Sequence, residues 1–265
     1  MTAPQSDDAE PTRSIELEVE VPGTPEQVWE AIATGPGITA WFVPAEVEER
    51  EGGTARMDFG SLGVEEAVIT AWEPPRRFAY RTGGRDGAGF MAFEWLVEGR
   101  GDGTCVLRLV QSGMLGDDWE TEYDALGKGW EMYLHQLGQY LRYFRGRPVT
   151  PVTIFGPGPG DPDRLWPELR RGLGLAGEPA EGDRVRLTPG GIDPIEGVVD
   201  YLSPDILGVR SDDGLYRFVC GFDGSVGVGH HLYAGDVDAK EAEGAWQAWL
   251  DRLFPQGEDE ETASP

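Results

Sequence analysis

Three histidines offer the widest range of chemistry in this sequence, because an imidazole can bind a metal or transfer protons near neutral pH. His135 lies in a helix-like segment, whereas His230 and His231 are adjacent in a strand-like one. None has a His or Cys partner at a metal-ligand spacing such as HExxH or CxxC. Adjacent strand residues point to opposite faces, so at most one of His230 and His231 can enter a shared site. The sequence predicts no metal site and no cofactor.

His135 and Tyr133 are the remaining weak candidates for acid–base catalysis. An oriented His beside Tyr133 or Tyr80 could relay a proton on an enolisable substrate, although a plain surface or core histidine is the more common situation. The serines lie in turns, and none stands in a GxSxG elbow. The glycine-rich stretches near residues 83 and 156 lack the Lys and Ser/Thr of a phosphate-binding loop. No convincing catalytic constellation is present, which favours a non-enzymatic function.

The net charge of the chain limits the kinds of molecule that it is expected to bind. The chain has 22 basic and 48 acidic residues, a formal net charge of −26, which repels nucleic-acid phosphates and anionic lipid. The first residues contain no basic and apolar signal segment, and nowhere do about eighteen apolar residues run together. We expect a cytoplasmic protein with no nucleic-acid or membrane partner. Cys105 and Cys220 stand in apolar strand-like runs and are expected to be buried thiols.

The elements that would position these residues follow from periodicity. Residues 13–21 alternate apolar and charged positions, as in a strand with one buried face. Thr24, Pro25 and Gln27 predict a capped helix start, and a second short helix follows. Residues 45–112 then form six strand-like stretches separated by Gly- or Pro-containing turns, which predicts an antiparallel meander. A long amphipathic helix extends from about residue 117 to 144, and Gly127 with Gly129 is its weak point, where a kink is possible.

The chain is expected to contain two domains. Residues 1–12 and 256–265 are predicted to be disordered tails, the second acidic, around a first domain at 13–146 and a smaller α+β domain at 163–255. Residues 147–162 contain five Pro and read as a Pro/Gly linker. The order of strands, a Pro-marked turn and a Trp-containing closing helix recurs in both halves. The second domain is therefore either a truncated, degenerate copy of the first or an unrelated α+β domain.

Several stretches of the first domain resemble a known family. They are VPGTPEQVWEAIATGPGITAWF, FEWLVEGRGDGTCVLRLVQSG and GKGWEMYLHQLGQYL. Together they resemble the Hsp90-ATPase-activator-homologue branch of the START/polyketide-cyclase (SRPBCC) superfamily. The resemblance covers about half of the chain and implies an α+β helix-grip fold, in which an antiparallel sheet curls around a long C-terminal helix.

This resemblance implies that a hydrophobic or aromatic small molecule binds, without catalysis, in the groove between sheet and helix. The expected ligand-binding residues share the inward faces of three strands and the helix: Phe78, Tyr80, Met91, Phe93, Trp95, Leu107, Leu109, Trp130, Tyr133, Leu134 and Leu137. Val97 and Cys105 have the same strand phase. The alternative is that these residues bind no ligand and only fill the hydrophobic core of the domain. The resemblance also leaves open an Hsp90-type chaperone as the partner, a polyketide aromatase/cyclase activity, or sequestration of a natural product.

Overall fold

The computed structural model describes residues 13–83, 90–113, 119–159, 162–221 and 224–255. The two predicted disordered tails, 1–12 and 256–265, lie outside these residues. The chain divides into two compact units, which we call the first unit (1–37, 45–57 and 65–141) and the second unit (38–44, 58–64 and 142–265). Each unit is built around its own antiparallel sheet.

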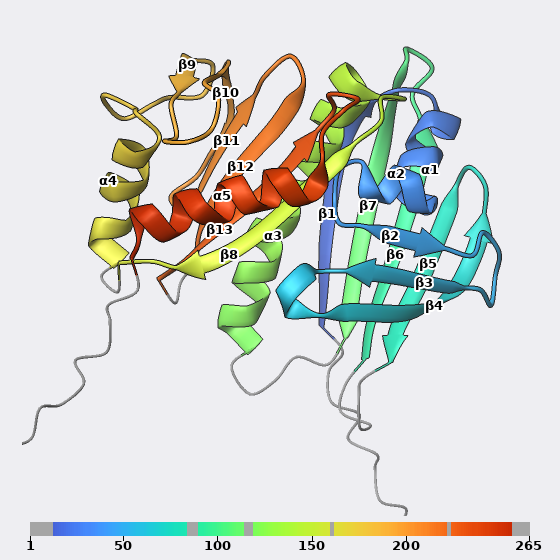
Figure 1. The fold of residues 1–265 in the computed structure, drawn as a ribbon. Coiled ribbons are helices and arrows are strands. Elements are labelled where there is room, and N and C mark those ends of the chain that lie inside the picture. The colour runs from blue at the N-terminus through green and yellow to red at the C-terminus, as the bar shows by residue number, and fades with distance from the viewer. Residues whose placement is uncertain (1–12, 84–89, 114–118, 160–161, 222–223, 256–265) are drawn as a thin grey trace, which may run out of the picture. The chain divides into compact units, whose positions relative to one another are not determined.

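The first sheet has seven strands in the order β1-β7-β6-β5-β4-β3-β2. Its strands are β1 (Arg13–Pro22), β2 (Ala45–Val47), β3 (Thr54–Asp58), β4 (Val64–Glu73), β5 (Arg77–Gly83), β6 (Phe90–Gly99) and β7 (Thr104–Gly113). β1 pairs with β7 from Arg13 opposite Gly113 to Pro22 opposite Thr104. The predicted first strand and the six-strand meander are confirmed (Figure 1).

The helices of the first half interrupt and follow this meander. They are α1 (Pro25–Ala33), α2 (Gly35–Thr39), the 3-10 turn η1 (Gly60–Leu62), α3 (Trp119–Gln139) and the π-helical turn η3 (Tyr140–Phe144). The Thr24 side chain accepts from the Gln27 backbone, and the Gln27 side chain accepts from the Thr24 backbone, so the predicted capping box is present.

Gly127 and Gly129, the predicted weak point, do not break the long helix. α3 continues through both glycines, and its buried side chains Trp130, Leu134 and Leu137 recur at steps of three and four. Packing of this stripe offsets the helix-breaking tendency of the glycines. The irregular turn comes later, at η3.

The second sheet has six strands in the order β8-β13-β12-β11-β10-β9. Its strands are β8 (Thr150–Pro157), β9 (Arg184–Leu187), β10 (Ile195–Leu202), β11 (Ile206–Arg210), β12 (Gly214–Cys220) and β13 (Ser225–Leu232), with helices α4 (Pro162–Gly172) and α5 (Ala239–Leu253). α5 extends across the sheet and packs along β8 (Figure 1). Leu169 of α4, Phe218 of β12, and Trp246 and Trp249 of α5 belong to one buried core.

The prediction of a linker at residues 147–162 is wrong for eight of these residues, because they form strand β8. Pro151 and Pro157 lie within this strand, opposite His231 and Ser225. A proline cannot donate to a sheet ladder, so it is confined to edge strands and strand ends. β8 is an edge strand whose neighbour in the sheet is β13, and its prolines are tolerated for that reason.

The two sheets share one topology. In each, the first strand pairs with the last, and the remaining strands follow in reverse order from there. Helices follow the first strand in both (α1 and α2, or α4), and one helix follows the last (α3 or α5). The second sheet has one strand fewer. The α+β class is confirmed, and the recurrence predicted from the sequence is present in the strand order, while duplication itself stays a prediction.

Candidate functional site

The residues expected to bind a ligand lie together on one face of the first sheet and on α3. Tyr80 of β5 stands opposite Phe93 of β6, and Phe93 stands opposite Gln111 of β7. Trp130 of α3 contacts this face through its ring. Nine of the expected residues are at most 7% exposed: Phe78, Tyr80, Phe93, Trp95, Leu107, Leu109, Trp130, Leu134 and Leu137. Met91 and Tyr133 are half-buried, so they are the more exposed members of the cluster.

Five rings form a continuous series that we call the aromatic ladder: Phe78, Tyr80, Phe93, Trp130 and Tyr133. The Tyr80 and Phe93 rings are stacked with centroids 4.8 Å apart, and Phe78 lies 5.4 Å from Tyr80. Edge contacts of 6.1 Å and 6.2 Å join Trp130 to Phe93 and Tyr133. Aromatic pairs at such separations stabilise beyond the area that they bury.

The polar tips of the buried aromatic residues have partners within the cluster. The Trp130 Nε1–H donates to Gln111 Oε1 over 2.6 Å. Burial raises the pKa of Tyr80 well above its ordinary value, and a hydrogen bond with Trp95 offsets this in part. Gln111 was missed by the sequence analysis, although it continues the alternation of Cys105, Leu107 and Leu109 and was readable from that phase.

The two weak catalytic candidates do not converge. Tyr133 and His135 are two residues apart on α3, so their side chains leave the axis about 200° apart. His135 Nε2 instead lies 3.2 Å from Gln139 Nε2, one turn further along the helix. Burial raises the pKa of Tyr133, which keeps its hydroxyl protonated and makes it a poor general base near neutral pH.

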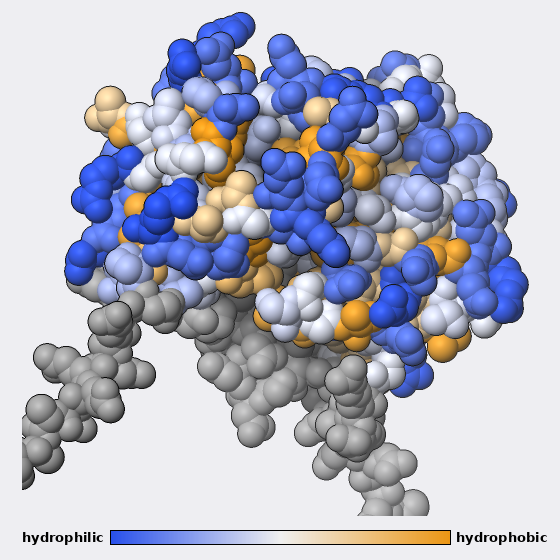
Figure 2. Space-filling model, in the orientation of Figure 1, coloured by the Kyte–Doolittle hydropathy of each residue, from blue (hydrophilic) through white to orange (hydrophobic). Residues whose placement is uncertain are grey.

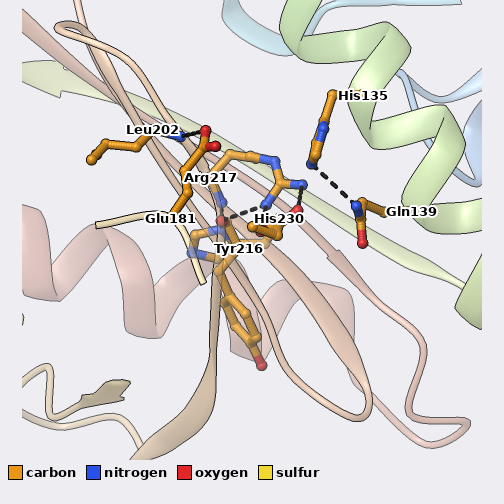
Figure 3. A network of polar contacts seen from close by, with 8 residues as sticks. His135, Gln139, Glu181, Leu202, Tyr216, Arg217 and His230 are labelled. Carbon is orange, nitrogen blue, oxygen red and sulfur yellow. Dashed lines mark hydrogen bonds and ion pairs between the residues drawn. The ribbon is translucent and has the colours of Figure 1, made fainter. Parts of the chain in front are cut away.

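A second polar cluster, which the sequence analysis also missed, lies in the second unit (Figure 3). Arg217 of β12 binds Asp200 of β10 through two hydrogen bonds of 3.0 and 2.7 Å. Their side chains are 1% and 4% exposed. Such a pair is costly to bury and requires matched geometry, so each residue fixes the conformation of the other.

The backbone N–H of Arg217 donates to His230 Nδ1, so the other ring nitrogen of a neutral His230 carries the proton. The His230 ring lies 4.4 Å from that of Trp246 at 73°. Burial holds the pKa of His230 well below its ordinary value, and burial lowers the pKa of His231 to about 3. Both rings are therefore neutral at physiological pH and belong to the packing of the unit.

We also searched the described residues for a metal site, a membrane-spanning helix and a large hydrophobic surface patch. Within the described ranges, no group of three or more His, Cys, Asp or Glu side chains could hold a metal ion. The helices described there are too short or too polar to cross a membrane. On the face shown in Figure 2, hydrophobic residues form small patches separated by hydrophilic ones.

An open groove of about 560 Å³ lies in the second unit, lined by Gly60, Ser61, Thr153, Ile154, Phe155, Lys240, Glu243, Gly244 and Gln247. Its lining contains no buried polar side chain. The aromatic ladder with Gln111 is thus the better candidate site, because it combines apolar burial with a convergent polar group.

Fold and site together define an α+β domain in which a long helix packs on the inward face of an antiparallel sheet. Residues 22–142 match the family model "Activator of Hsp90 ATPase homolog 1-like protein". The predicted resemblance to this family is confirmed for that segment, which is just under half of the chain.

Solved structures with a similar fold include CalU16 from Micromonospora echinospora, 25% identical over 49% of this chain and 75% of that one, with a TM-score of 0.42. DynU16, a putative protein in the dynemicin biosynthetic locus, is 18% identical over 91% and 95%, with a TM-score of 0.44. The di-domain ARO/CYC BexL from the BE-7585A biosynthetic pathway is 14% identical over 91% and 95%, with a TM-score of 0.46. No curated protein matches the sequence.

Proposed function

We propose that the first unit binds a hydrophobic, planar aromatic small molecule between its sheet and α3, without catalysing a reaction. The observation that carries this proposal is the aromatic ladder, which extends from buried Phe78 to half-buried Tyr133. A planar ligand entering beside Met91 and Tyr133 would continue the series of ring contacts. Aromatic side chains with a few placed polar groups are typical of such sites.

The surface of α3 beside Trp130 is uncovered at Gly127. Gly127 precedes Trp130 by three residues, so the two lie next to each other on the helix surface. No described atom lies within 4 Å of the position that a Cβ on Gly127 would occupy. A tricyclic ligand of about fourteen heavy atoms, at about 0.4 kcal/mol per atom, would bind with about 6 kcal/mol, a Kd of tens of micromolar.

The geometry favours binding over catalysis. His135 leaves α3 on a different side from Trp130 and Tyr133. Burial raises the pKa of Tyr133, so its hydroxyl stays protonated and is not available as a base near neutral pH. A cyclase would need an acid or base within hydrogen-bond reach of its substrate. Sequestration of a natural product needs only the binding step and is compatible with the same site.

The first test measures binding of planar aromatic compounds, flavonoids and fatty acids by quenching of Trp fluorescence and by the rise in melting temperature. Ligand that binds only the folded state raises the melting temperature in proportion to its occupancy. We expect several aromatic compounds to bind the native chain and His135→Ala equally well.

A steric pair of variants locates the site. Gly127→Leu places a side chain in the open space next to Trp130 and should weaken binding at least tenfold. Lys128→Leu, which replaces an exposed neighbour, should leave the affinity unchanged. Equal affinities for the two variants, or no binding to the native chain, would refute the proposal.

The family match supplies a second candidate, stimulation of an Hsp90-type chaperone ATPase, because the matching model is described as an activator of that enzyme. A chaperone would dock on the surface of the domain, not inside the ladder. The discriminating measurement is the ATPase rate of a purified Hsp90-type chaperone with increasing amounts of this protein. Saturable stimulation that survives Gly127→Leu would favour the chaperone role.

A further inference from the structure

Gln111 is a buried polar residue that contacts the aromatic ladder through Trp130. It lies on β7 between Phe93 of β6 and Ile15 of β1 and is 5% exposed. An apolar side chain would fill this position as well and would carry no desolvation cost. A polar side chain placed among rings calls for a partner on each of its hydrogen-bonding atoms.

The orientation of the Gln111 amide is fixed by chemistry. The Trp130 indole N–H can only donate, so the atom that faces it over 2.6 Å must be the amide oxygen. The amide nitrogen consequently points the other way, toward Met91. Trp130 thus acts as a positioning residue that determines which end of the amide faces half-buried Met91.

The Gln111 nitrogen is incompletely satisfied. It has two N–H groups, and in the described chain its acceptor is Met91 Sδ at 3.5 Å, a weak acceptor. Met91 is half-buried and flexible, so a ligand can displace it. The Trp95 indole can only donate, so the buried Tyr80 oxygen accepts from it. The Gln111 N–H faces half-buried Met91 instead and is therefore the donor next to the more exposed side of the cluster.

We propose that Gln111 is the polar anchor of the site and selects planar aromatic ligands that carry a carbonyl oxygen. This inference rests on the proposed binding function and names the chemical class of its ligand. The carbonyl accepts from Gln111 Nε2 in place of Met91 Sδ, while the rings of the ligand contact Trp130 and Tyr133. A hydrocarbon of equal shape binds without this hydrogen bond.

The test compares 9-fluorenone with fluorene, which share one tricyclic frame and differ in the carbonyl group. Titration calorimetry on the full chain should show fluorenone binding about 2- to 10-fold more tightly, as one neutral hydrogen bond predicts. In Gln111→Met, whose thioether can accept from Trp130 but cannot donate, the ratio should fall to about one and the fluorene affinity should persist. A preference that survives Gln111→Met, or a native chain with no preference, would overturn the inference.

A second variant covers the case in which Gln111→Met does not fold. Trp130→Phe keeps an aromatic ring but removes the indole N–H, so the amide can turn its oxygen toward the ligand. The preference should then shift from 9-fluorenone toward 9-fluorenol, which can donate to that oxygen. An unchanged preference for the ketone contradicts the role of Trp130. Failure of fluorene itself to bind the native chain refutes the proposed function, whereas fluorene binding with no ketone preference refutes only the anchor.

Discussion

Replacing Asp200 by Asn should destabilise the second unit by about 3–5 kcal/mol, because it leaves the Arg217 guanidinium buried without its counter-charge. Both side chains are nearly inaccessible, at 1% and 4% exposure, so water cannot replace the lost carboxylate. The guanidinium would keep its hydrogen bond to the Tyr216 carbonyl, which is neutral and compensates only in part. The expected loss is a large fraction of the stability of an ordinary domain.

Chemical denaturation followed by Trp fluorescence measures this loss, since Trp246 and Trp249 lie in the core of the same unit. The matched double variant Asp200→Leu with Arg217→Met removes both charges and replaces them with apolar side chains. It should be within about 2 kcal/mol of the native chain, because apolar replacement of a whole buried pair is often neutral or stabilising.

Two results would contradict this reasoning. A cost below about 1 kcal/mol for Asp200→Asn would mean that solvent reaches Arg217 despite its burial. A double variant as unstable as the single one would mean that packing around Gly208, where a Cβ would lie 2.8 Å from Arg217 Nη1, requires the arginine itself.

Two further predictions concern pH and the first helix. Burial lowers the pKa of His230 and His231, so below about pH 6.5 the unfolded chain takes up protons that the folded chain excludes. The free energy of unfolding should therefore be independent of these two histidines above about pH 6.5. Below that pH it should fall by up to about 1.4 kcal/mol per pH unit for each histidine. Denaturation at pH 7, 6 and 5 measures this slope, and a flat profile would contradict it. Thr24→Ala removes the capping box of α1 and should lower the free energy of unfolding by about 1 kcal/mol, whereas replacing exposed Lys128 by Ala should change it little.

Much of the first unit could be predicted because its strands face a core on one side and solvent on the other. The alternation in residues 13–21 and the capping signals at Thr24 and Gln27 lead directly to β1 and α1. The inward phase of β6 and β7 was also readable, and Leu107 and Leu109 are fully buried as that phase requires.

The failures have physical causes in particular residues. β8 was missed because its prolines suggest a linker, and a sequence does not reveal that a strand will be at the edge of a sheet. Arg217 is the single charge of β12 and Asp200 is one of two acidic residues of β10, and only the structure shows that they meet. Gln111 was overlooked since the expected site was defined by apolar residues, although its strand phase placed it in the cluster.

The shared strand order has a consequence for how this chain folds. Arg108 and Glu18, which form an ion pair between neighbouring strands, are 90 residues apart in sequence. β1 therefore has no neighbouring strand in its sheet until β7 has been synthesised, and β8 has none until β13 has been synthesised. Contacts of such long range make folding slow and leave strand edges exposed in the meantime. A nascent chain that stops before β7 thus carries an unpaired β1, and each unit can close its sheet only when its last strand arrives.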